Sequence, residues 1–133
     1  MSTHAALIIK TDGIYQGCYL HFDGYPAHVA PILSNDFNSA KAAEALVKIG
    51  MIESITLGGF IKSGTSWGKR AETTFGATIE EIAKKMGVLH IYVFDGSWTY
   101  DVIPITKDFR RSPKWKYKGH ELEDVMHTPT TKE

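Results

Sequence analysis

Residues 5–22 read AALIIKTDGIYQGCYLHF, and this stretch indicates the fold more clearly than any other. It holds two β-rich runs on either side of Asp12-Gly13, a dipeptide typical of a tight hairpin turn. Two further β-rich runs, 88–94 and 98–105, flank Asp95-Gly96 towards the other end of the chain. The sequence therefore predicts two β-hairpins, one near each end of the ordered part.

Helical patterns lie between the hairpins. Pro26 can open a short first helix that ends near Asn35, since a missing N–H costs nothing in a first turn. Asn38 or Ser39 can cap a second, alanine-rich helix that stops at Gly50. Thr78 to Glu81 has the capping-box pattern of a third helix. Leu122, Val125 and Met126 hint at a short terminal one.

These elements predict an α+β fold. Because the apolar side of a sheet must be covered, we expect a four-stranded antiparallel sheet, built from the two hairpins, with about three helices on one face. The 133 residues suit a single domain, 1–133, with an ordered core at about 5–127. Exposed strand edges in such a sheet make a homodimer a further expectation.

Composition excludes several classes of protein. Fifteen basic and fifteen acidic residues balance, so no strong overall field attracts nucleic acid or an anionic membrane. No apolar run approaches the roughly 20 residues that span a bilayer. The lone cysteine, Cys18, cannot form an internal disulfide and suits a reducing cytoplasm. The six histidines lack metal-ligand spacing, so we expect neither a metal nor a cofactor.

The string His21-Phe22-Asp23-Gly24-Tyr25-Pro26 joins a predicted strand to a predicted helix. A histidine beside an aspartate can act as an oriented base, so His21 and Asp23 are candidate catalytic residues and Tyr25 a candidate binding residue. In the alternative interpretation these residues only build the corner: Asp23 and Gly24 make the turn, and His21 and Tyr25 fasten it by hydrogen bonds.

A glycine-rich loop at about 56–76 is too long for an ordinary connection. Its glycines, hydroxyls and cations could surround phosphate oxygens, although the order of residues is not that of a phosphate-binding loop. The alternative is a plain surface loop. The candidate nucleotide-binding residues are Lys62, Ser63, Thr65, Trp67, Lys69 and Arg70.

A basic-aromatic segment spans 107–118. Cations beside aromatic rings suit an acidic protein surface or, less well, single-stranded nucleic acid. Acidic residues follow at once, which argues against strong nucleic-acid affinity, and the segment can equally be a solvated tail. Its candidate binding residues are Arg110, Arg111, Lys114, Trp115 and Tyr117.

The opening hairpin, the His21–Pro26 string and the later Tyr92–Trp98 hairpin together resemble small uncharacterised proteins encoded by tailed phages and prophages. The resemblance covers roughly residues 5–102, and only the six-residue string is distinctive. Phe22 stands where tryptophan is familiar, and Ala27-His28 also departs from the pattern. The resemblance implies a phage context and no particular activity.

We therefore expect a non-enzymatic, cytoplasmic accessory protein that binds a host protein or defence factor and modulates it, most simply as an inhibitor. The alternative is a nucleotide-binding protein that sequesters its ligand. A catalytic version of this alternative uses His21 as a base oriented by Asp23, beside the loop residues 62–70, to hydrolyse the nucleotide.

Overall fold

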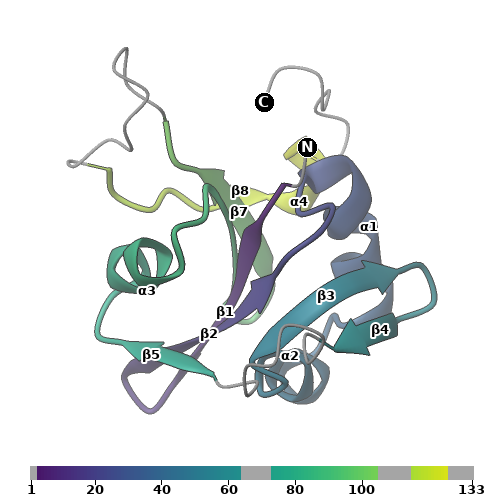
Figure 1. Cartoon of the computed structure of the whole chain (residues 1–133), viewed down its shortest axis with the longest axis horizontal. Helices are drawn as coiled ribbons and strands as arrows, with labels where there is room; N and C mark the ends of the chain where they lie inside the picture. The colour runs from purple at the N-terminus through teal and green to yellow at the C-terminus, as the bar shows by residue number, and fades with distance from the viewer. Residues whose placement is uncertain (1–2, 64–72, 105–114, 126–133) are drawn as a thin grey trace.

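The computed structural model describes residues 3–63, 73–104 and 115–125 (Figure 1). The strands are β1 (Ala5–Thr11), β2 (Ile14–Leu20), β3 (Met51–Thr56), β4 (Phe60–Ser63), β5 (Thr74–Gly76), β6 (His90–Phe94), β7 (Trp98–Val102) and β8 (His120–Glu121). The helices are α1 (Pro26–Asp36), α2 (Ala40–Val47), α3 (Ile79–Met86) and α4 (Leu122–Val125).

The described strands form one mixed sheet in the order β4-β3-β2-β1-β6-β7-β8, with β5 beside β2. The pairs β1–β2, β3–β4 and β6–β7 are antiparallel hairpins, whereas β1–β6 and β2–β3 are parallel. Both hairpins predicted from Asp-Gly turns are present. They lie next to each other through the parallel pair β1–β6.

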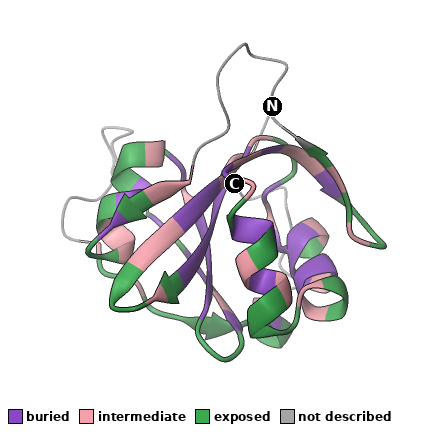
Figure 2. Ribbon diagram, turned by 90° about the horizontal axis from the view of Figure 1, so that it is seen from below, coloured by how far each residue is buried: buried purple, intermediate pink, exposed green. Residues whose placement is uncertain are grey.

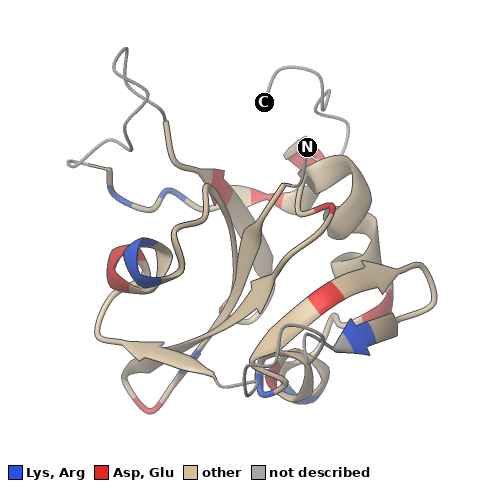
Figure 3. Cartoon of the chain, in the orientation of Figure 1, with Lys and Arg blue, Asp and Glu red and all other residues tan. Residues whose placement is uncertain are grey.

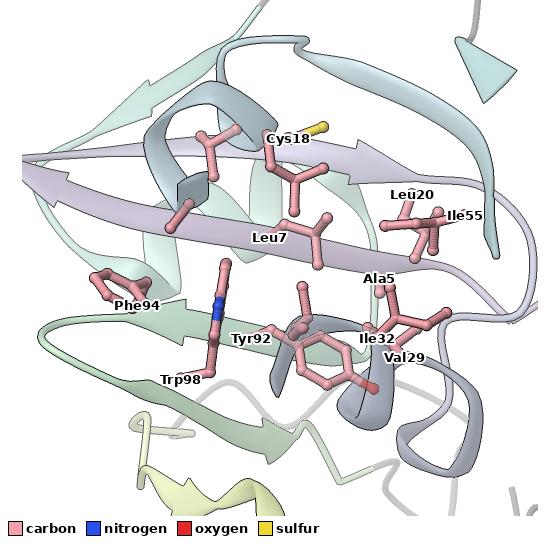
Figure 4. Close-up of a cluster of buried hydrophobic side chains, with 14 of the residues drawn as sticks. Ala5, Leu7, Cys18, Leu20, Val29, Ile32, Ile55, Tyr92, Phe94 and Trp98 are labelled. Atoms are coloured by element: carbon pink, nitrogen blue, oxygen red, sulfur yellow. The ribbon is translucent and has the colours of Figure 1, made fainter. Parts of the chain in front are cut away.

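Strand β1 is buried on both faces. Leu7 and Ile9 pack with α1 and α2 in the larger apolar cluster (Figure 4), and Ile8 packs with Ile82 of α3 in a second cluster on the opposite face. The buried colour accordingly runs along the middle strands of the sheet in Figure 2. Helices therefore cover both faces of the sheet.

The predicted architecture was wrong in two respects. The sheet has eight described strands and mixed pairing instead of four antiparallel strands, and its helices do not share one face. The extra strands were missed because Gly58 and Gly59, which were predicted to belong to a loop, make the turn of the β3–β4 hairpin. Both have positive φ, +90° and +77°, which favours glycine. A continuous apolar run such as residues 5–9 is also typical of a strand buried on both sides.

The starts of the helices follow local chemistry as predicted, although α2 ends at Val47 and not at Gly50. The Ser39 hydroxyl accepts a hydrogen bond from the Ala42 amide, and the Thr78 hydroxyl accepts one from Glu81. Helix α3 ends at Gly87, which is left-handed with φ of 69°. None of the helices in the described ranges combines the length and the apolar character that crossing a bilayer requires.

Close packing of α3 on β2 gives a first prediction. A Cβ atom at Gly17 would lie 2.7 Å from Ile82 Cγ2 and 2.9 Å from Met86 Cε. We expect Gly17→Ala to lower the free energy of unfolding by about 1–3 kcal/mol in denaturant titrations, because α3 must shift. In an Ile82→Ala background, where the Cγ2 atom is absent, Gly17→Ala should lower the free energy of unfolding much less. Equal costs in both backgrounds would contradict this packing.

The buried histidine of β6 gives a second prediction. Burial lowers the pKa of His90 to about 4, and its Nδ1 lies 2.5 Å from the Tyr100 hydroxyl. Below about pH 6.5 the His90 side chain takes up a proton in the unfolded chain but not in the folded chain. The free energy of unfolding should therefore fall between about pH 6.5 and 4, by roughly 3 kcal/mol in total from this group. Denaturant titrations across this pH range test the prediction. In His90→Gln the free energy of unfolding should decrease less steeply with falling pH. An equally steep fall in the variant would contradict it.

Candidate functional site

The predicted corner joins β2 to α1 and is firmly built into the fold. The buried Tyr92 hydroxyl donates to the Gly24 carbonyl at 2.7 Å. Asp23 adopts a left-handed backbone with φ of 56° and is exposed. Pro26 occupies the first turn of α1, as predicted, and Tyr25 is the N-cap residue without a side-chain cap bond. The turn at Asp23 and Gly24 agrees with the structural interpretation, but the side chain that fastens it here is Tyr92 and not Tyr25.

His21 is packed among other rings. Its Nδ1 lies 3.0 Å from the Tyr19 hydroxyl, and its imidazole stacks on that of His4 with ring centroids 4.6 Å apart. Phe22 meets the His21 ring edge-on at 4.5 Å. Burial, and then the charge of His4, lower the pKa of His21, while Glu53 acts in the opposite direction. The group contacting Nδ1 is thus a phenol, where the sequence suggested the Asp23 carboxylate.

The structure brings two predicted candidates towards one place. Glu53 of β3 raises the pKa of His21 and also forms an ion pair with Lys62 of β4, with the nitrogen and oxygen atoms 3.6 Å apart. Figure 3 shows an acidic position on β3 and a basic position on β4. His21 and Lys62 are therefore linked through one carboxylate. The predicted glycine-rich loop at about 56–76 is wrong in part, because residues 60–63 form β4 and residues 74–76 form β5. The role of these side chains towards a nucleotide stays a prediction.

The β3–β4 hairpin displays large apolar side chains. Leu57 in its turn is 66% exposed, and Phe60 at the start of β4 is 73% exposed. The turn is braced from α1, because the Asp36 carboxylate accepts a hydrogen bond from the Gly58 amide at 3.1 Å. The Gly59 amide donates to the Thr56 carbonyl, which closes the turn. The hairpin thus exposes two apolar side chains beside a turn that two hydrogen bonds hold.

A shallow hollow of about 410 Å³ adjoins this turn, lined by Ala27, His28, Pro31, Thr56 and Leu57. His28 is fixed in its wall by a 2.7 Å hydrogen bond from its Nε2 to the Ile55 carbonyl. Thr56 is the cross-strand partner of Phe60, so the Phe60 backbone lies close to the hollow. The Phe60 side chain does not line the hollow, because it alternates with Ile61, which packs into the core. We call Ala27, Pro31, Leu57 and Phe60 the hairpin surface.

The described part of the basic-aromatic segment is bound to the domain. The buried Asp101 carboxylate accepts hydrogen bonds from Trp115 Nε1 at 3.0 Å and from the Lys118 amide at 2.8 Å. The Tyr117 hydroxyl lies 2.6 Å from Thr99 Oγ1, and burial raises the Tyr117 pKa. Trp115 and Tyr117 therefore fasten residues 115–118 to β7, and their binding to a partner stays a prediction.

The candidate residues do not form one site. Lys62 lies on β4 at one side of the sheet, whereas Trp115 and Tyr117 contact β7, five strands away. At about 4.8 Å per strand this is a separation of roughly 24 Å, too far for one small ligand. Thr65, Trp67, Lys69, Arg70, Arg110, Arg111 and Lys114 lie outside the described residues, as does the side chain of Ser63.

Other chemistry finds little support in the described ranges. Burial raises the pKa of Cys18 to about 12, so its thiol stays protonated and is a poor nucleophile. Within the same residues no three His, Cys, Asp or Glu side chains gather as a metal ion would require. Comparison of the chain with known protein families, with curated proteins and with solved structures gave no match.

Sequence reasoning missed the hairpin surface and the His4–Tyr19 contacts. Leu57 and Phe60 flank Gly58-Gly59, and an apolar pair around a glycine turn could have suggested a hairpin with exposed apolar residues. No local pattern places His4 beside His21, because the contact crosses 17 positions of the chain.

The Asp101 anchor gives a third prediction. An amide in place of the carboxylate offers only one acceptor oxygen for three donors: Val102 N, Trp115 Nε1 and Lys118 N. We expect Asp101→Asn to cost about 1–3 kcal/mol in denaturant unfolding and to release the Lys118 amide in hydrogen exchange. Asp95→Asn, in the exposed β6–β7 turn, is the control. Unchanged protection of Lys118 would show that another contact holds the segment.

Proposed function

We propose that the protein binds a host protein through the hairpin surface and modulates it. The simplest form of this is inhibition, in which the protein blocks a functional surface of that partner. The supporting observation is the pair Leu57 and Phe60, which are 66% and 73% exposed on a hairpin that Asp36 braces. Single exposed apolar residues are ordinary, but two on one braced hairpin, one of which lines a hollow, support a protein-binding surface. The resemblance to phage-encoded proteins is the reason for proposing a partner from the host cell.

The partner's chemistry follows from the surface. The hollow of about 410 Å³ can take one aliphatic or aromatic side chain, with Ala27 and Pro31 as its apolar wall. The Lys62 ammonium nearby is already paired with Glu53, so the strand carries little net charge towards a partner. We infer a partner that presents a large apolar residue on an uncharged patch. A braced hairpin also loses little conformational entropy on binding.

The place of action is part of the proposal. A phage-type protein that modulates a host factor would work in the host cytoplasm. The protonated thiol of Cys18 and the absence of any disulfide requirement are compatible with that reducing compartment.

The fourth prediction tests this surface directly. Tagged wild type is used to capture proteins from bacterial lysate, and the captured protein is then purified and titrated by calorimetry. We expect Leu57→Ser with Phe60→Ser to weaken that binding by roughly ten- to hundredfold, while stability changes by less than about 0.5 kcal/mol. Phe75→Ser, which removes an aromatic ring that is 55% exposed on β5, is the matched control and should bind normally.

Two results would overturn the proposal. Equal affinity of the double variant and wild type would place the interface elsewhere, for example on the basic-aromatic segment. A wild type that sediments as a dimer at micromolar concentration, with the double variant a monomer, would show that a second copy of the chain occupies the hairpin surface.

A further inference from the structure

The segment just before β1 lies across the corner between β2 and α1. The Thr3 carbonyl accepts a 2.8 Å hydrogen bond from the Gly24 amide, and His4 Nδ1 lies 2.6 Å from the His21 carbonyl. The backbones approach so closely that a Cβ at Gly24 would lie 2.9 Å from the Thr3 oxygen. Residues 3 and 4 therefore hold the corner through two long-range hydrogen bonds.

The second of these bonds depends on a histidine that stacks on another. The His4 and His21 rings are 4.6 Å apart and nearly parallel, at 23°. Because a carbonyl can only accept, His4 Nδ1 carries a proton and donates to it. Stacked neutral imidazoles attract each other, but two imidazolium ions at this distance repel.

Protonation of His21 also changes its bond to Tyr19. In the neutral ring the Tyr19 hydroxyl can donate to Nδ1 over 3.0 Å, but a protonated Nδ1 is a donor and the hydroxyl must turn round to accept. Burial and the charge of His4 both lower the pKa of His21, so the two rings resist being charged together. The arrangement of the corner thus disfavours the charged form of His21.

We propose that the His4–His21 pair is a pH-dependent latch, which holds residues 3 and 4 on the corner when neutral and releases them when both rings are protonated. The groups around the pair are His4 from the N-terminal segment, Tyr19 from β2, Phe22 and the exposed Asp23 from the corner, Glu53 from β3 and, through its ion pair, Lys62 from β4. Glu53 favours the charged form of His21, but it affects the pKa of His21 less than the charge of His4 does, so repulsion between the imidazoles prevails.

Release would be local. The Gly24 carbonyl stays bound to the buried Tyr92 hydroxyl, and Phe22 and His21 keep backbone hydrogen bonds to Glu53 and Ile52 of β3. The corner therefore remains in place when the segment leaves, and the Gly24 amide loses its acceptor. The uncapped start of α1, at Tyr25 and Pro26, lies directly beyond it. A low-pH form would differ from the neutral one at this surface alone.

Hydrogen exchange of the Gly24 amide, followed by NMR, is the fifth prediction. Between about pH 7.5 and 5, the protection factor of Gly24 in wild type should fall roughly tenfold more than that of the Ile103 amide. Ile103 is buried and its amide donates to the Leu89 carbonyl, so it serves as the reference for effects of acid outside the corner, including that of His90. In His4→Gln the side-chain amide can still donate to the His21 carbonyl but cannot gain charge. The protection factor of Gly24 should then change with pH as that of Ile103 does.

Each alternative result overturns the latch. If Gly24 and Ile103 lose protection in parallel in wild type, acid acts on the whole fold. If Gly24 loses its protection equally in wild type and His4→Gln, the charge on His4 is irrelevant. His21→Gln is the second variant. It removes the other charge and should also make Gly24 follow Ile103, so an acid-sensitive Gly24 in this variant would contradict the proposal.

Discussion

The rest of the structure depends on the burial of β1 from both sides. Leu7 and Ile9 face α1 and α2 while Ala6 and Ile8 face α3, so neither face can be left without helices. The strand pairs antiparallel with β2 and parallel with β6, which joins the two hairpins into one sheet. This central position leaves β4 at one end of the sheet order, where its hairpin can offer apolar side chains to a partner.

Local chemistry predicted the elements better than their assembly. The Asp12-Gly13 and Asp95-Gly96 turns and the caps at Ser39 and Thr78 depend on neighbours a few residues apart, and all are present. The parallel β1–β6 pair joins residues some 85 positions apart, as in Ala5 with His90, and no short pattern specifies it. The strands around Gly58-Gly59 were missed because turn glycines and loop glycines look alike in sequence.

The candidate site shows the same limit. The corner string was recognised, yet partners of His21 come from two distant stretches, represented by His4 and Glu53. The aromatic residues Trp115 and Tyr117, attractive as exposed anchors, instead satisfy Asp101 and Thr99. Sequence indicates which side chains could do chemistry, but packing decides which are used for stability. The hairpin surface became visible only when exposure and bracing could be compared.

The central claim is that the hairpin surface meets a partner protein. Its most direct test is a photoreactive phenylalanine analogue placed at Leu57 in one protein and at Phe75 in another, both exposed positions, irradiated in bacterial cells. The account predicts one discrete cross-linked host protein from position 57, competed by excess wild type, and none from position 75. The same cross-link from both positions, or cross-links only to a second copy of the chain, would contradict it.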